Sequence, residues 1–396
     1  MSHLMNTYGR QPITFTHGKG VWLWDKDGNQ YLDALAGVAV NGLGHAHPKL
    51  VKAISEQAAK LIHVSNIYHI AEQEALADKL AEISDMDKVF FCNSGCEANE
   101  AAIKLARLYG HNKGVENPEI IVMERSFHGR TMATLSATGN RKAQAGFEPL
   151  VSGFIRVPYD DLEAIRQIAS RKNNVVAILV EPVQGEGGVH IPVDMRAYLQ
   201  GLRQVCDDNA WLLMLDEVQS GIGRTGAWFA FQHTGIVPDV ITIAKGLGSG
   251  VPIGACVAKG TAAEVFTPGK HGSTFGGNPL ATTAGLTTLN AIADEKLREN
   301  AQQMGDVICD GLRTALNGLA GVVVIRNAGL MIGIELDRPC ADLVKMALAD
   351  KLLINVTAEK VVRLLPPLVI NAVEANELVS RLAALIKTFL HQPDKV

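Results

Sequence analysis

The sequence predicts an α/β fold, with a large domain built on a mostly parallel sheet between helices and a smaller α+β domain. Continuous apolar runs at residues 119–124, 174–180, 211–215 and 240–244 predict buried strands, and amphipathic helical stretches such as residues 195–208 separate them. Strands of this kind alternating with helices are typical of a parallel sheet covered on both faces. Polar residues follow these runs, and the ligand site of such sheets lies beyond the carboxyl ends of the strands.

In chain order, residues 1–50 are expected to join the small domain, residues 51–285 to form the large domain, and residues 286–396 to form the C-terminal small domain. An Asp27-Gly28 turn predicts two short strands within residues 18–33. Hydrophobic periodicity predicts further elements. These are helices at 49–62, 72–83 and 280–319, strands at 322–326 and 330–336, and a helix at 341–351 followed by a strand and a final helix.

Composition excludes several classes of protein. The 396 residues are 47% hydrophobic and 20% charged, which is ordinary globular composition. The net charge of −4 without a dense basic run argues against nucleic acid or a membrane surface as partner. No uncharged apolar stretch of about 18 residues predicts a membrane span. The first residues lack the apolar core of a secretion signal, and six scattered cysteines without a C-x-x-C pair favour reduced thiols in a cytoplasm.

Lys245 ends the apolar run 240–244 and is followed by a glycine-rich segment. A lysine at the end of a buried strand is costly unless it has a partner. A neutral amine can react with an aldehyde cofactor, so one good partner is covalent. The alternative is a strand-end lysine that reaches solvent.

A second informative stretch joins a strand at 88–92 to a helix that begins near Ser94 and Gly95. Helix N-termini favour anions, so this turn is a candidate phosphate site, with a plain capped helix as the alternative. Residues 221–226 match the dinucleotide pattern G-x-G-x-x-G, but no clean helix follows them. His45 and His47 have no third ligand at a usual spacing, so we expect no metal site.

Together, the acid-bearing segment 212–226 (LLMLDEVQSGIGRTG), the lysine strand and residues 272–279 (GSTFGGNP) resemble the signature of the class-III aminotransferases. The resemblance covers the whole chain and implies fold type I of the transferases that depend on pyridoxal 5'-phosphate (PLP). Residues 31–48, 93–100 and 126–131 are most similar to the acetylornithine aminotransferases within that family. Cys96 departs from them, since alanine or threonine is commoner there.

By this resemblance Lys245 would hold PLP covalently and move protons. Asp216 would keep the pyridine nitrogen protonated and Gln219 would meet the phenolic oxygen. Phe127 and Val218 would sandwich the ring. The implied cofactor-binding residues are Ser94, Gly95, Cys96, Phe127, Asp216, Glu217, Val218, Gln219, Lys245 and Thr274.

The resemblance also assigns substrate roles, because guanidinium groups grip carboxylates at two points. Arg130 would hold the α-carboxylate of N-acetylornithine, and Arg363 that of glutamate or 2-oxoglutarate. Glu186 would mask Arg363 when the ω-amine donor is bound. Ser273 would lie near the substrate and Thr274 would reach the phosphate of a neighbouring subunit, which implies a homodimer with shared sites. Surface salt bridges are the alternative role for both arginines.

The implied reaction moves the terminal amine of N2-acetyl-L-ornithine to 2-oxoglutarate, in arginine biosynthesis. Its products are N-acetyl-L-glutamate 5-semialdehyde and L-glutamate. The alternatives are transaminases for ornithine, succinylornithine, succinyldiaminopimelate or 4-aminobutyrate. An aminomutase of the same fold would need no second keto acid, and a non-catalytic binding protein would have no use for Lys245, Asp216 and Gln219 together.

Overall fold

The computed structural model describes residues 3–391, and within them the largest sheet has seven strands in the order β4-β10-β9-β8-β7-β5-β6. Its strands are β4 (Lys88–Cys92), β5 (Glu119–Met123), β6 (Phe154–Val157), β7 (Val175–Val180), β8 (Leu212–Asp216), β9 (Val240–Ile243) and β10 (Gly254–Ala258). β10 is antiparallel to both of its neighbours, whereas the pairs that join β6, β5, β7, β8 and β9 are parallel. The prediction of a mostly parallel sheet is therefore confirmed.

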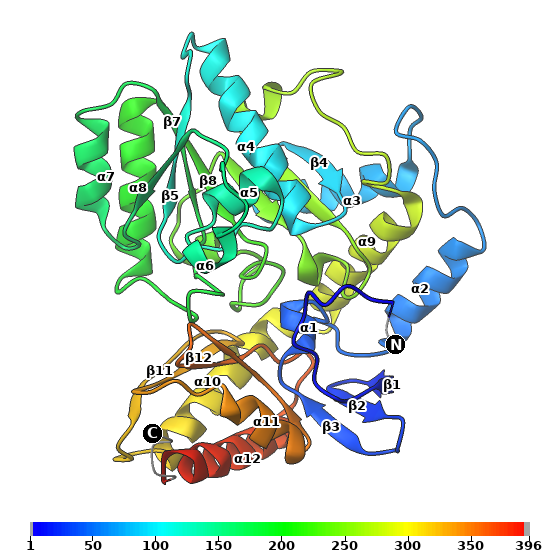
Figure 1. Cartoon of the computed structure of the whole chain (residues 1–396). Coiled ribbons are helices and arrows are strands. Elements are labelled where there is room, and N and C mark those ends of the chain that lie inside the picture. Colours follow the sequence, from blue (N-terminus) through cyan, green and yellow to red (C-terminus); the bar gives the residue numbers. More distant parts are fainter. Residues whose placement is uncertain (1–2, 392–396) are drawn as a thin grey trace.

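Helices α4 (Gly95–Asn112) and α8 (Met195–Asn209) pack against this sheet from opposite faces (Figure 1). The alternating side chains of β8 explain why helices cover both faces of the sheet. Leu212 and Met214 belong to the apolar cluster that contains the buried side of α4, and Leu213 and Leu215 belong to the cluster that contains α8. Because successive side chains of a strand point to opposite faces, a continuously apolar strand must be covered on both.

The other helices of this upper part of the molecule lie around the sheet or, like α2 against α9, pack on a helix beside it (Figure 1). They are α2 (Pro48–Ala58), α3 (Ala71–Ser84), α5 (Met132–Ala137), α6 (Arg141–Gln144), α7 (Leu162–Ala169) and α9 (Pro279–Asp294). Between residues 3 and 391, no helix combines the length and the apolar character that a membrane span requires.

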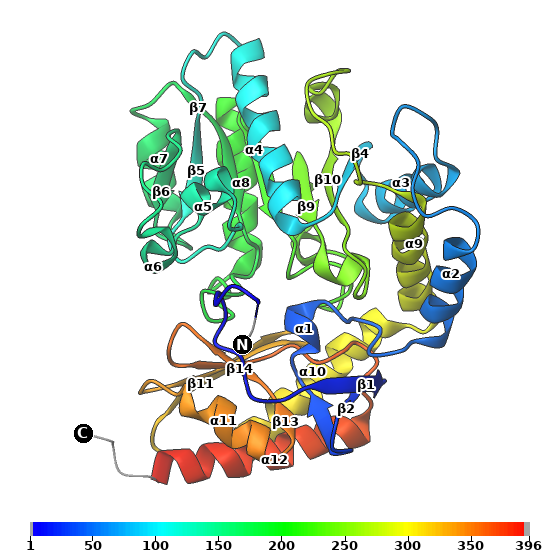
Figure 2. The same ribbon diagram turned by 45° about the vertical axis from the view of Figure 1, so that its right-hand side comes forward.

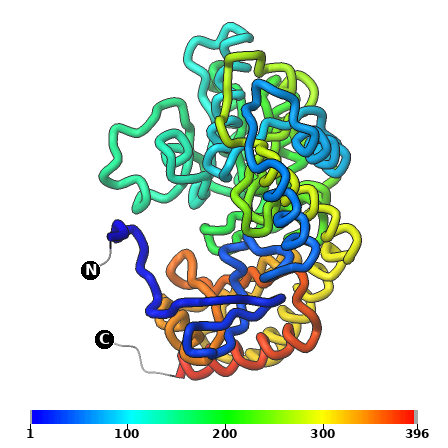
Figure 3. The backbone as a smooth tube through the Cα atoms, turned by 90° about the vertical axis from the view of Figure 1, so that its right-hand side faces the viewer, coloured from blue at the N-terminus to red at the C-terminus, as the bar shows by residue number. Residues whose placement is uncertain are grey.

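Two four-stranded sheets lie below within the described residues (Figure 2). They are β1 (Phe15–Lys19), β2 (Trp22–Asp25), β3 (Gln30–Asp33) and β13 (Leu352–Leu353), and then β11 (Val322–Ala328), β12 (Met331–Leu336), β15 (Val361–Leu364) and β14 (Asn355–Thr357). Helices α10 (Leu297–Ala315), α11 (Asp342–Ala349) and α12 (Ala372–His391) accompany them. Leu32 of β3 pairs with Leu352 of β13, so the N-terminal segment lies beside the C-terminal part (Figure 3).

The predicted single helix over residues 280–319 is wrong. Helix α9 ends at Asp294, α10 begins at Leu297, and Lys296 between them has a left-handed φ of 53°. A residue in that region cannot continue a right-handed helix, and no glycine or proline marks the break in the sequence. Strands β1, β6 and β10 were not predicted, and β13, β14 and β15 stand where a single strand was predicted. β10 (GACVA) is rich in small residues with little strand preference of their own.

Candidate active site

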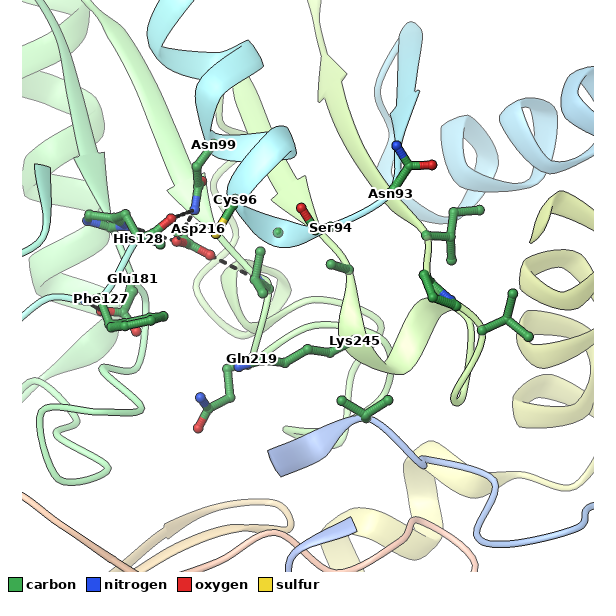
Figure 4. Close-up of a pocket in the computed structure, with 18 of the residues that line it drawn as sticks. Asn93, Ser94, Cys96, Asn99, Phe127, His128, Glu181, Asp216, Gln219 and Lys245 are labelled. Carbon is green, nitrogen blue, oxygen red and sulfur yellow. Dashed lines mark hydrogen bonds and ion pairs between the residues drawn. The ribbon is translucent and has the colours of Figure 1, made fainter. Parts of the chain in front are cut away.

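A cavity of about 340 Å³ opens where β4, β5, β7, β8 and β9 end, and it gathers most of the residues that the sequence singled out (Figure 4). Its lining includes Ser94, Gly95, Cys96, Phe127, Asp216, Val218, Gln219 and Lys245, together with Asn99, His128 and Glu181. These residues lie at or after the ends of five different strands. The sheet therefore concentrates their chemistry at one edge, as parallel sheets do.

Lys245 follows β9 after one residue, Ala244, and reaches across the cavity toward Gln219 (Figure 4). Its backbone has a left-handed φ of 43°, an unfavourable conformation for a lysine. Burial of the side chain, and next the nearby Arg363, lower the pKa of the Lys245 amine. A lowered pKa increases the neutral, nucleophilic fraction of the amine, which suits a covalent role.

Asp216 is held by a network that the sequence did not predict. Its Oδ2 accepts a hydrogen bond from Asn99 Nδ2 at 2.8 Å and lies 2.8 Å from His128 Nδ1, while its Oδ1 accepts from the backbone N–H of Val218 at 3.0 Å. Asn99 is fixed in turn by the hydroxyl of Thr242, which donates to Asn99 Oδ1 at 2.7 Å. All four side chains are buried. The signal was present, since Asn99 is a polar residue on the otherwise apolar side of α4.

The first turn of α4 closes another side of the cavity. Ser94 caps the helix by accepting a hydrogen bond from the backbone N–H of Glu97 at 3.2 Å, and Gly95 and Cys96 begin the helix. The first backbone N–H groups of a helix have no partner within it and form a ready anion site. A Cβ on Gly95 would lie 2.8 Å from Val218 Cγ1, so only glycine lets the helix start this close to that side chain.

Arg363 lies in β15 and is almost fully buried, with 1% of its surface exposed. Its Nη1 is 2.7 Å from Glu186 Oε1 and 3.2 Å from Gln219 Oε1, and its Nε donates to Asn355 Oδ1 at 3.1 Å. The Glu186 side chain is 36% exposed, so the buried cation is paired with a carboxylate that retains access to solvent. The structure thus brings Glu186 and Arg363 together across 177 positions of the chain.

Arg130 is exposed, and its Cζ lies 5.7 Å from the centre of the Phe127 ring. It lines a second cavity of about 920 Å³ together with Phe127 and Glu186, so the two cavities share Phe127. Arg130 itself is absent from the lining of the Lys245 cavity. Further cations line the same space, namely Arg125, Arg141, Lys142, Arg326 and Lys360.

Three more predicted site residues, besides Arg130, Glu186 and Arg363, lie outside the lining of the Lys245 cavity. Ser273 and Thr274 line a third cavity of about 380 Å³, where Asn93 Nδ2 donates to Ser273 Oγ at 3.3 Å. Glu217 is buried on the other side of its loop and accepts hydrogen bonds from the Ser220 hydroxyl and from the backbone N–H of Phe231. Burial raises the pKa of the Glu217 carboxyl to about 7.

The residues of the Lys245 cavity fit PLP by their chemistry. A primary amine, a buried carboxylate and the start of an 18-residue helix face one space, and Phe127 and Val218 add apolar surface to it. These groups match an aldehyde, a ring nitrogen and a phosphate respectively. A dinucleotide is a poor match, since residues 221–226 lie outside the cavity lining and form turns, not the start of a helix.

Comparisons with known proteins agree with this chemistry. The family model "Aminotransferase class-III" matches residues 5–386. The acetylornithine aminotransferase of Nitrosomonas europaea is 63% identical over 98% of this chain and 99% of its own, and that of Methanothermobacter thermautotrophicus is 51% identical over 97% and 96%. Among solved structures, ornithine aminotransferase from Toxoplasma gondii superposes with a TM-score of 0.94 at 33% identity, covering 98% of this chain and 93% of that one. Acetylornithine aminotransferase from Elizabethkingia anophelis gives 0.88 at 34%, covering 98% and 97%.

Proposed function

Because this chain belongs to the class-III aminotransferases, we propose that it moves the terminal amine of N2-acetyl-L-ornithine to 2-oxoglutarate, a step of arginine biosynthesis. The products are N-acetyl-L-glutamate 5-semialdehyde and L-glutamate. The observation that carries the proposal is the Arg363–Glu186 pair beside Lys245, because an exchangeable pair suits an enzyme that binds an ω-amine and a dicarboxylate in turn. The names of full-length relatives at 46–63% identity support the same donor.

We propose PLP as the cofactor. A solved relative from Toxoplasma gondii, 33% identical, is described with PLP at its active site. When bound, PLP supplies an aldehyde that accepts the amino group and a ring that withdraws electrons from the substrate carbon. Lys245 would provide the amine that binds the cofactor and then carry protons to and from the substrate carbon.

The remaining residues of the cavity would orient and polarise the bound groups. Asp216, with its carboxylate already oriented by Asn99 and His128, would keep the ring nitrogen protonated. Gln219 would hold the phenolic oxygen, and Phe127 and Val218 would exclude water from the ring faces. The N–H groups of Gly95 and Cys96, with Ser94, would bind the phosphate.

The two arginines would share the substrates. Arg363 would bind the α-carboxylate of glutamate after Glu186 withdraws from it, and would remain paired with Glu186 when acetylornithine is bound. Arg130 would bind a carboxylate of either substrate from the rim of the wider cavity.

We also propose a homodimer in which Ser273 and Thr274 complete the site of the neighbouring subunit. Both residues lie outside the Lys245 cavity of their own chain, and Thr274 is exposed. Sedimentation should show a dimer or larger, with activity lost together with the dimer on dilution, and a fully active monomer would contradict this.

The domain division at residues 50 and 285 and a cytoplasmic location are further proposals. The pairing of β3 with β13 supports the placement of the N-terminal segment with the C-terminal part. All six cysteines of the chain lie within the described residues and are free, five of them buried, which suits a reducing compartment.

Initial rates with four amino donors and 2-oxoglutarate test the proposed reaction. Acetylornithine should give the highest kcat/KM, above ornithine, succinylornithine and 4-aminobutyrate. Ornithine is the second candidate donor, because the solved ornithine aminotransferase superposes with the higher TM-score of the two structures compared above. A preference for ornithine would replace the proposed donor, and turnover without any keto acid would indicate an aminomutase.

A further inference from the structure

Glu181 is a buried carboxylate to which the proposed reaction assigns no role. It follows β7 directly, has 4% of its surface exposed and lines the Lys245 cavity next to Phe127 (Figure 4). No lysine or arginine of the described chain lies within ion-pairing distance of it. Its two oxygens instead accept one backbone hydrogen bond each, from the N–H of Phe127 at 2.9 Å and from the N–H of Gly185 at 3.1 Å.

Each of these two N–H groups belongs to a loop that carries a site residue. The first loop presents the Phe127 ring to the cavity, and Arg130 lies over that ring. The second loop continues from Gly185 into Glu186, the partner of Arg363. The loops follow different strands, β5 and β7, so the Glu181 side chain is a direct connection between them.

The second loop also rests directly on Gln219. A Cβ on Gly185 would come within 2.3 Å of Gln219 Oε1, so the glycine backbone and the amide are in close contact. Gln219 accepts in turn from Arg363 Nη1 at 3.2 Å. A displacement of Gly185 would therefore move Gln219, which is proposed to hold the phenolic oxygen, and through it Arg363.

We propose that Glu181 is a positioning residue whose ionised carboxylate ties the Phe127 loop to the Glu186 loop. It thereby sets the position of Glu186 relative to Arg363, the pair called the gate below. The inference rests on the proposed function, because the Glu186–Arg363 pair has to open and close only if an ω-amine and a dicarboxylate bind in turn. An ionised carboxylate has acceptor sites on both oxygens, whereas protonation converts one oxygen into an O–H donor. The protonated acid therefore holds one of the two loops less well.

The surroundings of Glu181 place this change near neutral pH. Burial raises the pKa of Glu181 to about 7; His128 opposes the shift and Asp216 adds to it. Two further titratable groups face it, the Tyr159 phenol and the Lys245 amine. The tether should therefore tighten as the pH rises through about 7.

Hydrogen exchange measures the tether without reference to activity. At pH 8, Glu181→Gln should raise the exchange rate about tenfold in peptides containing residues 127 and 185, because an amide has a single acceptor oxygen for two N–H donors. The matched control is Glu217→Gln, which removes a buried carboxyl whose pKa is likewise raised to about 7, directly after β8, the strand next to β7, and should leave both peptides unchanged. Unchanged exchange in Glu181→Gln would overturn the proposal.

Kinetics then tests the consequence. The single-turnover rate with glutamate should fall below about pH 7 in the wild type, whereas Glu181→Gln should be slower and should not show this decrease. Glu181→Asp keeps the charge on a shorter side chain, so its rate should be reduced but should still decrease at acidic pH. If the rate of Glu181→Gln still decreases at acidic pH, another group is responsible for the titration and the positioning role of Glu181 is overturned. A wild type inactive with all four donors would refute the proposed function, while hydrogen exchange would still decide the tether.

Discussion

Asp216 and Arg363 face the same region of the molecule and are both nearly inaccessible, yet their partners differ in kind. Asp216 contacts the buried side chains of Asn99 and His128 and the backbone N–H of Val218. Arg363 pairs with Glu186, whose side chain is 36% exposed on a loop. A charge that serves one unchanging cofactor can be preorganised completely. A charge that serves two substrates in turn needs a partner that can leave.

The strongest test of the cofactor side is removal of Lys245. Lys245→Ala should lower turnover by about 10⁴-fold or more, because both the covalent amine and the proton carrier are lost. Borohydride treatment of the yellow wild-type protein should remove its visible band and leave an adduct that mass spectrometry places on Lys245. An adduct on a different lysine would contradict the assignment.

Asp216→Asn is expected to have the next largest effect. The change keeps the size of the side chain but removes the negative charge beside the proposed ring nitrogen, so turnover should fall about 100- to 1,000-fold while cofactor remains bound. The measurement is kcat together with the cofactor content of the purified variant. Near-normal kcat at full cofactor content would show that Asp216 is not the partner of the ring nitrogen.

Arg363→Ala tests the exchangeable pair and should separate the two half-reactions. The rate with glutamate should fall about 100-fold or more and the rate with acetylornithine far less, because only glutamate brings a carboxylate to this site. Single-turnover spectroscopy with each donor measures both rates.

Two reciprocal variants sharpen this test. Glu186→Ala leaves a buried cation unpaired when acetylornithine binds and should therefore impair acetylornithine more than glutamate. Arg130→Ala should slow both donors. Equal slowing of both donors by Arg363→Ala would remove the division of labour and the gate role of Glu186.

The smallest expected effect concerns stability, at Glu217. Its pKa rises on folding to about 7, so the folded state holds this proton more tightly than the unfolded state. Such a group stabilises the fold below its unfolded pKa, and that stabilisation is lost as the pH rises through about 7. Glu217→Gln should therefore reduce the decrease in unfolding free energy between pH 5 and pH 8 by about 2 kcal/mol. Urea unfolding at both pH values checks this, and an unchanged decrease would contradict it.

Much of the fold follows from local patterns in the chain. The apolar run that becomes β9 and the glycines after Lys245 predicted the strand and its exit, and the predicted strand at 211–215 lies within one residue of β8. Hydrophobic periodicity and turn chemistry depend on neighbours in the sequence, which is why they can be read without the structure. The helix break at Lys296 was not predicted, because no helix-breaking residue marks it in the neighbouring sequence.

Some features of the site could likewise be predicted from the sequence, whereas others appear only in the structure. The strand ends supplied the set of chemical groups that meets at the cavity, since parallel strands bring their carboxyl ends to one edge. The contacts of Asp216 with Asn99 and His128, and of Glu181 with two loops, join side chains and backbones from different strands. Such contacts depend on how helices and loops pack in three dimensions, which carries no periodic signature. The sequence alone therefore determined which chemistry gathers at the site, and only the tertiary structure decided which groups orient one another there.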